Sequence, residues 1–249
     1  MLVTGNNRLD RSKSNQYTLS IRINSGGFCF FVCDSVTKEV MYQSNFLISG
    51  SSASLDLQRF FDTNDFLRYD FSSVVVDIDT PDCFFVPKVY FEEDSLEQEA
   101  LFVLGEKVKR SLPLFTYLDH AELYVVFMFD KEMWDLLCHN LARPIFRSSV
   151  ESDYNTVIGR LKDGDDKQSF LFFRDDYITW ISVEAGKITL INSFRVTSIE
   201  DVVYFAVHIS EQISFDRTED TLYLTNLTHT SVNQVQSNLS KFFNKIESL

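Results

Sequence analysis

Two stretches of the chain carry the same succession of hydrophobic and polar positions. Residues 170–194 contain the runs FLFFRDD, YITWISVE and KITLINSF, and residues 19–46 contain LSIRINSGG, FCFFVCD and EVMYQSNF. Short runs of β-branched and aromatic residues bounded by turn residues predict strands, so each stretch is predicted to form a three-stranded meander. A helical pattern and one more apolar strand follow each meander, SVVVDID in the first case and TLYLTNL in the second.

The spacing between the two stretches is constant. Phe46 matches Phe194 and Val74 matches Leu222, and both pairs are 148 residues apart. Single hairpins recur in many folds, but one offset that persists through three strands, a helix and a fourth strand indicates a duplicated β-β-β-α-β unit. We therefore predict an α/β fold with two similar halves, each a mixed sheet flanked by helices.

Composition divides the chain into a leader and these two halves. Residues 1–14 are polar and lack the apolar run of a signal peptide, so they are expected to be a disordered leader. The clearest linker is Asp163-Gly164-Asp165-Asp166. We expect the first half over residues 15–162 and the second over residues 163–249.

Periodic apolar positions and capping residues predict the elements between the strands. Ser54 is expected to cap the helix that begins at Leu55. Pro81 and Pro87 predict an irregular crossing over residues 82–91. Helices are expected over residues 55–66, 92–105, 131–143, 199–213 and 232–246, a helix or extended crossing over 151–162, and a strand over 122–129.

Overall composition indicates a folded globule. Apolar residues make up 45% of the 249 residues and 24 of them are Phe, so aromatic-rich cores are expected. No window of 18 uncharged apolar residues occurs, so no membrane span is expected. The four cysteines contain no CxxC pair, and Cys29 and Cys33 are about 13 Å apart along one strand face. Free thiols of this kind are typical of a reducing compartment, and we expect a cytoplasmic location.

Charge and motif content exclude several function classes. A net charge of −13 opposes binding to nucleic acid and to anionic lipid. Asp77 and Asp79 have the spacing of a two-metal nuclease site, but the strand over residues 19–24 lacks the third carboxylate that such a site needs. The sequence contains no HExxH, GxSxG, GxGxxG or P-loop motif. We therefore predict no catalytic residue and no metal ligand.

The repeated unit resembles the actin-like ATPase superfamily, whose halves have a ribonuclease H-like core. Members include actin, sugar kinases, the Hsp70 nucleotide-binding domain, FtsA and PilM. More narrowly, the chain is similar to a family of uncharacterised bacterial proteins, a domain of unknown function placed in that superfamily. The resemblance covers about residues 17–246 and rests on element order and the repeat. It implies that ATP and Mg²⁺ would be held in a cleft by three chain segments.

Two of those segments are strand turns that usually contain DxG, in which the Asp organises Mg²⁺ and the backbone amides face the phosphates. The first turn here is Asn24-Ser25-Gly26-Gly27, so the glycines are present and the Asp is absent. Ser25, Gly26 and Gly27 form either an anion-binding nest or an ordinary hairpin loop. The second turn, Arg174-Asp175-Asp176, has carboxylates but no glycine, and Asp175 is either a ligand contact or a plain turn residue.

The third segment is the adenosine motif, an aliphatic strand followed by Gly-Gly. Asn226-Leu227 stand where the glycines should be, and the side chain of Leu227 would occupy the space of the nucleotide. No glycine follows Gly186, so a shifted alignment does not restore the motif.

These departures predict a pseudo-ATPase: a non-catalytic actin-like protein without a cofactor that acts as a cytoplasmic protein-binding or scaffold module. Its Pro81–Phe91 segment either recognises the partner or packs its aromatic side chains into the core. The alternative is a weak ATP-binding or ATPase/kinase-like protein that holds Mg-ATP between the halves. Its nucleotide contacts would be Ser25, Gly26, Gly27, Asp175 and Asn226.

Overall fold

The computed structural model of the chain describes residues 9–48, 52–161, 167–174, 176–226 and 232–249. The strands are β1 Tyr17–Asn24, β2 Gly27–Asp34, β3 Val40–Leu47, β4 Ser73–Ile78, β5 Cys83–Pro87, β6 Ser111–Leu118, β7 Leu123–Asp130, β8 Ile145–Ser148, β9 Gln168–Phe173, β10 Tyr177–Glu184, β11 Lys187–Arg195, β12 Thr221–Asn226 and β13 Lys245–Ser248. The α-helices are α1 Ala53–Thr63, α2 Leu96–Leu104, α3 Lys131–Asn140, α4 Ser149–Ile158, α5 Ile199–Gln212 and α6 Val232–Leu239. Short 3-10 helices are Arg11–Gln16, Asp65–Arg68, Lys88–Tyr90, Glu93–Ser95, Glu106–Val108 and Asp119–Ala121.

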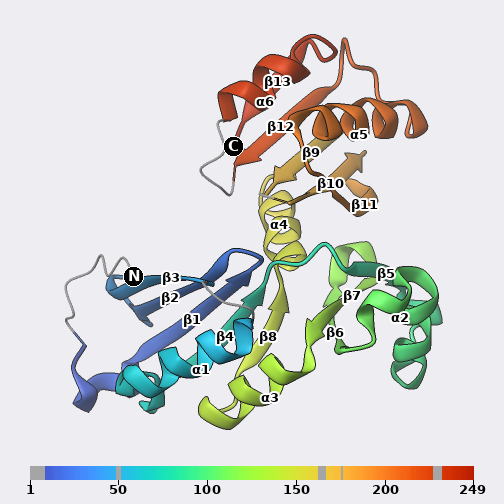
Figure 1. Cartoon of the computed structure of the whole chain (residues 1–249). Coiled ribbons are helices and arrows are strands. Elements are labelled where there is room, and N and C mark those ends of the chain that lie inside the picture. The colour runs from blue at the N-terminus through green and yellow to red at the C-terminus, as the bar shows by residue number, and fades with distance from the viewer. Residues whose placement is uncertain (1–8, 49–51, 162–166, 175, 227–231) are drawn as a thin grey trace. The chain divides into compact units, whose positions relative to one another are not determined.

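Two five-stranded sheets have the same strand order and the same strand directions. The first has the order β3-β2-β1-β4-β8 and the second β11-β10-β9-β12-β13 (Figure 1). In each, three antiparallel meander strands are extended by two parallel strands. A register shift also occurs at the sixth residue of each middle strand, after Val32 in β2 and after Ser182 in β10. The predicted α/β fold of two similar halves with mixed sheets is confirmed.

The chain divides into two compact units that interleave along the sequence. The first consists of Met1–Asp82, Glu92–Thr116 and Val126–Ser149, and the second of Cys83–Phe91, Tyr117–Val125 and Val150–Leu249. The predicted linker and the expected boundary at residues 162 and 163 lie outside the described residues.

In the first unit, a helix covers the apolar face of the sheet. Alternate side chains of β1 are buried, as the alternation in the sequence predicts. On the neighbouring strand, Phe30 stacks on Phe60 of α1 with 4.1 Å between the ring centroids. Ser52 caps α1, because its hydroxyl accepts a hydrogen bond from the Leu55 amide; the prediction that Ser54 is the cap was wrong. The hydroxyl of Ser54 instead lies 2.7 Å from that of Ser52.

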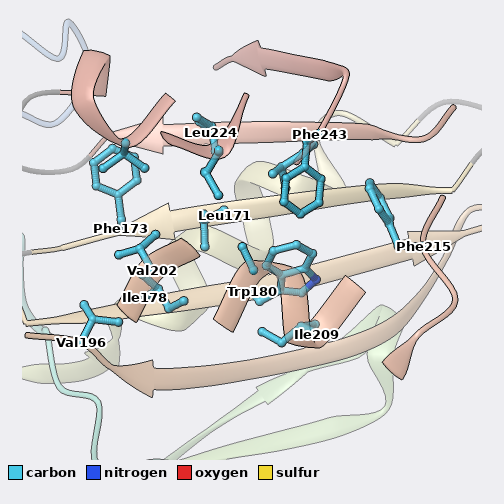
Figure 2. Close-up of a cluster of buried hydrophobic side chains, with 14 residues drawn as sticks. Leu171, Phe173, Ile178, Trp180, Val196, Val202, Ile209, Phe215, Leu224 and Phe243 are labelled. Carbon is cyan, nitrogen blue, oxygen red and sulfur yellow. The ribbon is translucent and has the colours of Figure 1, made fainter. Parts of the chain in front are cut away.

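In the second unit, α5 and α6 cover one face of the sheet. Trp180 lies at the centre of this core and is fully buried, with Phe215 edge-on to its ring and Phe243 against Phe215 (Figure 2). A capping box at Ser198 and Asp201 starts α5. All of β10 except Glu184 is buried, so this strand is covered on both faces. Trp180 also donates a hydrogen bond to Ser182 at 2.7 Å, which satisfies its ring nitrogen inside the core.

Two further local predictions were wrong. The helix expected over residues 232–246 ends at Leu239, and Lys245–Ser248 instead forms β13, which pairs in parallel with β12. The crossing expected to be irregular over residues 82–91 contains β5, which pairs with β7. Residues 1–8 of the expected leader lie outside the described residues, but order begins before residue 15, in the 3-10 helix Arg11–Gln16.

The first half contains an insertion between β4 and α3. It carries β5, β6 and β7, which form a three-stranded sheet in the order β5-β7-β6, and it also carries α2. In the second half, β12 and α6 are joined by residues 227–231 alone. None of the helices described is long and apolar enough to cross a membrane.

Candidate functional site

The turn between β1 and β2 is closed by its own asparagine. The carboxamide oxygen of Asn24 accepts hydrogen bonds from the backbone amides of Gly26 at 2.9 Å and Gly27 at 2.8 Å. These are the amides that a phosphate would need in an anion-binding nest. Ser25 and Gly26 are exposed and Gly27 is buried. Ser25, Gly26 and Gly27 therefore lie together in a hairpin turn, and Asn24 satisfies the backbone amides of both glycines.

Gly27 has a packing role that is independent of any ligand. A Cβ added at this position would lie 2.1 Å from the carbonyl oxygen of Phe46 on β3. A Cβ at Gly26 would meet only the Asn24 side-chain oxygen, at 3.5 Å. Neither glycine has a positive φ. The close approach of β2 and β3 is thus sufficient to explain why position 27 is a glycine.

Beside this turn, carboxylates and arginines of the first sheet alternate across neighbouring strands. Arg22 donates to Asp79 through Nε at 2.6 Å and Nη2 at 3.2 Å, a bidentate ion pair. In the parallel register, Asp77 lies between Arg22 of β1 and Arg147 of β8. Within the described ranges, no group of three or more His, Cys, Asp or Glu side chains is arranged to hold a metal ion. Cationic neighbours of this kind suit structural ion pairs better than a two-metal nuclease centre.

The turn between β9 and β10 places Arg174 where the first half has Asn24. Phe173 pairs with Ile178 as Ile23 pairs with Phe28, so the next residue along each strand occupies the same position. The backbone amide of Arg174 donates to the carbonyl of Tyr177 at 2.9 Å and closes the turn. Asp175, predicted as a contact to nucleotide, lies outside the described residues.

The guanidinium of Arg174 points into the protein rather than toward a ligand site. Its Nη2 donates to Oδ1 of Asp153 on α4 at 2.9 Å, and the two side chains are only 4% and 3% exposed. The guanidinium carbon also lies 4.9 Å from the centre of the Tyr177 ring. Sequence reasoning missed this pair. Arg174 was visible in the turn, but nothing in the helical pattern of residues 151–162 marked Asp153 as its partner.

The strand of the expected adenosine motif is β12, which pairs with β9 and ends at Asn226 opposite Phe173. This register puts the end of β12 next to the turn that contains Arg174. The side chain of Asn226 and all of Leu227 lie outside the described residues.

A hydrogen-bonded cluster attaches α4 to the 3-10 helix Asp119–Ala121. The Asp119 carboxylate accepts from the His120 ring at 2.9 Å and from the Tyr154 hydroxyl at 2.8 Å. These bonds lower the pKa of Asp119 to about 2. Burial, and then the bond to Asp119, raises the pKa of Tyr154 to about 12. The cluster therefore joins α4 to this 3-10 helix at the residue next to Asp153.

The segment Pro81–Phe91 is partly packed against the protein and partly exposed to solvent. Phe84 is buried, and Phe91 stacks on Tyr124 with 3.7 Å between ring centroids. Val89 and Tyr90 are exposed. Phe84 therefore belongs to the core and Phe91 is partly buried against Tyr124, whereas the 3-10 helix between them faces solvent.

The sequence of residues 6–246 matches the model of a family described as "Protein of unknown function (DUF3822)". The chain belongs to this family. A solved structure from Bacteroides thetaiotaomicron, described as a protein with actin-like ATPase fold and unknown function, is similar over 97% of this chain and 93% of that chain, with 25% identity and a TM-score of 0.87. The actin-like fold predicted from the repeat is thereby confirmed.

A second similar structure belongs to the PilM-PilN type IV pilus biogenesis complex. It covers 93% of this chain and 88% of that chain at 9% identity, with a TM-score of 0.59. At this identity the similarity shows the fold alone. No curated protein matches the DUF3822 chain.

Proposed function

We propose that this DUF3822 protein is a non-catalytic, cytoplasmic actin-like protein that binds another protein and uses no nucleotide. One observation carries the proposal. Asn24 in the first of the two phosphate turns, and Arg174 at the equivalent strand position in the second, direct their polar groups to partners within the chain.

The chemistry of the two positions opposes Mg-ATP for different reasons. A carboxamide at Asn24 carries no charge, so it binds Mg²⁺ more weakly than a carboxylate. A phosphate at this turn would also have to displace the Asn24 oxygen from the amides of Gly26 and Gly27. Arg174 could attract a phosphate only by leaving Asp153, and an uncompensated buried charge costs about 3–5 kcal/mol.

A weak nucleotide binder is the second candidate function. Exposure of Ser25 and Gly26 favours it, because a ligand could reach this turn without unfolding the sheet. In that case Ser25, Gly26, Gly27, Asp175 and Asn226 would supply the contacts.

A protein partner is supported by the similar fold of PilM, whose structure is that of a complex with PilN. The net charge of the chain indicates which kind of partner is favoured. At −13, this chain favours a partner that is basic or that docks through apolar side chains, and it disfavours nucleic acid.

Affinity capture from an extract of the native host, with and without added Mg-ATP, tests the proposal. We expect one protein in stoichiometric amount, retained equally under both conditions. Recovery of no such protein, together with a nucleotide or phosphorylated metabolite bound to the purified chain, would favour the nucleotide-binding or kinase-like candidate instead.

A further inference from the structure

The insertion of the first half exposes a short row of large apolar side chains. Leu101, Phe102 and Val103 follow one another near the C-terminal end of α2, and all three are exposed, with Phe102 91% exposed. The helix packs on the protein through Leu96 and Ala100, which are buried. The row therefore lies outside the contact that holds α2 in place. An aromatic side chain this exposed is typical of an interaction surface.

The segment that contains this row is acidic up to Glu106; Lys107, Lys109 and Arg110 follow it, and the two lysines pair with Asp82 and Glu106. Residues 92–106 contain Glu92, Glu93, Asp94, Glu97, Glu99 and Glu106, and no Lys or Arg. Within the described part of the chain, the first four of these carboxylates have no cation within ion-pair distance. Glu97 lies one helical turn before Leu101, and Glu99 one turn before Val103, so carboxylates lie beside the apolar side chains. The C-terminal end of a helix also favours cations, because its carbonyl groups carry partial negative charge.

We infer that α2 and the 3-10 helix Glu93–Ser95 form a docking surface for a basic amphipathic segment of a partner protein. The partner would centre its apolar side chains on Phe102, which lies between Leu101 and Val103 around the helix, and would place Lys or Arg side chains against the surrounding carboxylates. The inference rests on the protein-binding function proposed above and names the chemistry of the partner. A second copy of this chain is disfavoured, because two acidic surfaces repel each other.

Position in the fold supports this assignment. The two five-stranded sheets reach the same topology, yet only the first half carries the insertion with α2 (Figure 1). The shared sheet topology thus does not by itself account for the insertion. Aromatic side chains at the centre of an interface contribute most of its binding free energy, so Phe102 is the residue whose loss should matter most.

A labelled basic amphipathic peptide provides the direct test. The probe is an 18-residue helix former with Leu and Phe on one face and Lys on the other, and its control has Glu in place of each Lys. Fluorescence anisotropy should give binding of the basic peptide only. We expect Phe102→Ser to weaken this binding tenfold or more. Tyr204→Ser, which changes another exposed aromatic side chain on α5, should leave it unchanged.

Charge is tested with a second pair of variants. Glu93→Gln combined with Glu97→Gln should weaken peptide binding and reduce its dependence on salt, because fewer exposed charges remain to be screened. Glu200→Gln combined with Glu211→Gln removes the same charge from α5 and should have little effect.

Several results would overturn the inference. These are equal affinity of the wild type and Phe102→Ser for the basic peptide, absence of binding, or a dimer of the wild type that Phe102→Ser dissociates. Capture of a stoichiometric native partner by both the wild type and Phe102→Ser would also refute this surface, while leaving the proposed protein-binding function intact.

Discussion

At the scale of single residues, Asn24 and Arg174 occupy equivalent positions and satisfy their polar groups within the chain in two different ways. Asn24 keeps the shape of an aspartate without its charge, and it closes the turn on its own amides. Arg174 carries a positive charge and is neutralised by a buried Asp153. Both side chains therefore have polar partners within the chain.

The two glycines of the first turn should respond differently to alanine. Gly27→Ala should destabilise the protein by about 1–3 kcal/mol, because its Cβ would overlap the Phe46 carbonyl and force β2 and β3 apart. Gly26→Ala should change stability by no more than about 0.5 kcal/mol, since its Cβ meets nothing closer than ordinary contact. Urea unfolding of the two variants measures this difference, and equal stabilities would refute the packing role of Gly27.

The buried ion pair gives a second prediction. Arg174→Met should cost about 3–5 kcal/mol, because it leaves the Asp153 carboxylate buried without its cation. Adding Asp153→Leu should recover most of that loss. As a control, Arg217→Met breaks a partly exposed pair with Glu211 and should cost about 1 kcal/mol or less. Failure of the double variant to recover stability in urea unfolding would show that packing, and not charge, dominates at Arg174.

At the scale of elements, α4 is the helix whose placement depends most visibly on polar contacts. Asp153 joins it to Arg174 after β9, and Tyr154 joins it to Asp119. Local pattern predicted a helix or an extended crossing over residues 151–162 but neither contact, because each partner lies more than 20 residues away and on a different element.

Tyr154→Phe should therefore lower stability by about 1–2 kcal/mol near neutral pH, because the hydroxyl both donates to Asp119 and accepts from the His120 amide. Because the pKa of Asp119 is lowered from 3.8 to about 2, the stability that Asp119 contributes is fully present above pH 3.8 and is lost as the pH falls to about 2. Conversely, the pKa of Tyr154 is raised from 10 to about 12, so the stability it adds is present below pH 10 and lost toward pH 12.

Urea unfolding across this range tests the cluster. The difference between wild type and Tyr154→Phe should be constant from about pH 5 to about pH 9 and should shrink toward both extremes. A difference that stays constant down to pH 2 would show that Asp119 is not the acceptor that matters.

Two other elements show what local sequence patterns do not predict. The apolar stripe over residues 232–246 predicted one helix, and Phe243 is indeed buried in the core. The chain nevertheless leaves the helix at Leu239 so that Lys245–Ser248 can pair with β12, which is a long-range contact that local periodicity does not reveal. In β5, Pro87 stands at the end of the strand, where its missing amide costs least.

At the scale of the whole molecule, the strand meanders and their order were predictable, because strand patterning is local in sequence and the repeated offset of 148 residues can be read from the sequence directly. The strands confirm the repeat in topology, and a common origin of the two halves by duplication stays a proposal. The candidate site was predictable only in part. Departures from the superfamily motifs are visible in the sequence, but the use of Asn24 and Arg174 within the protein required three-dimensional contacts.

The most direct test of a degenerate nucleotide site is the thermal unfolding midpoint with and without Mg-ATP. We expect no resolved shift. A ligand present at 100 times its Kd would add about 2.7 kcal/mol. For a chain of this size that raises the midpoint by about 5–11 °C. A rise of that size in the wild type, abolished in Gly26→Val, would contradict the proposed loss of nucleotide binding.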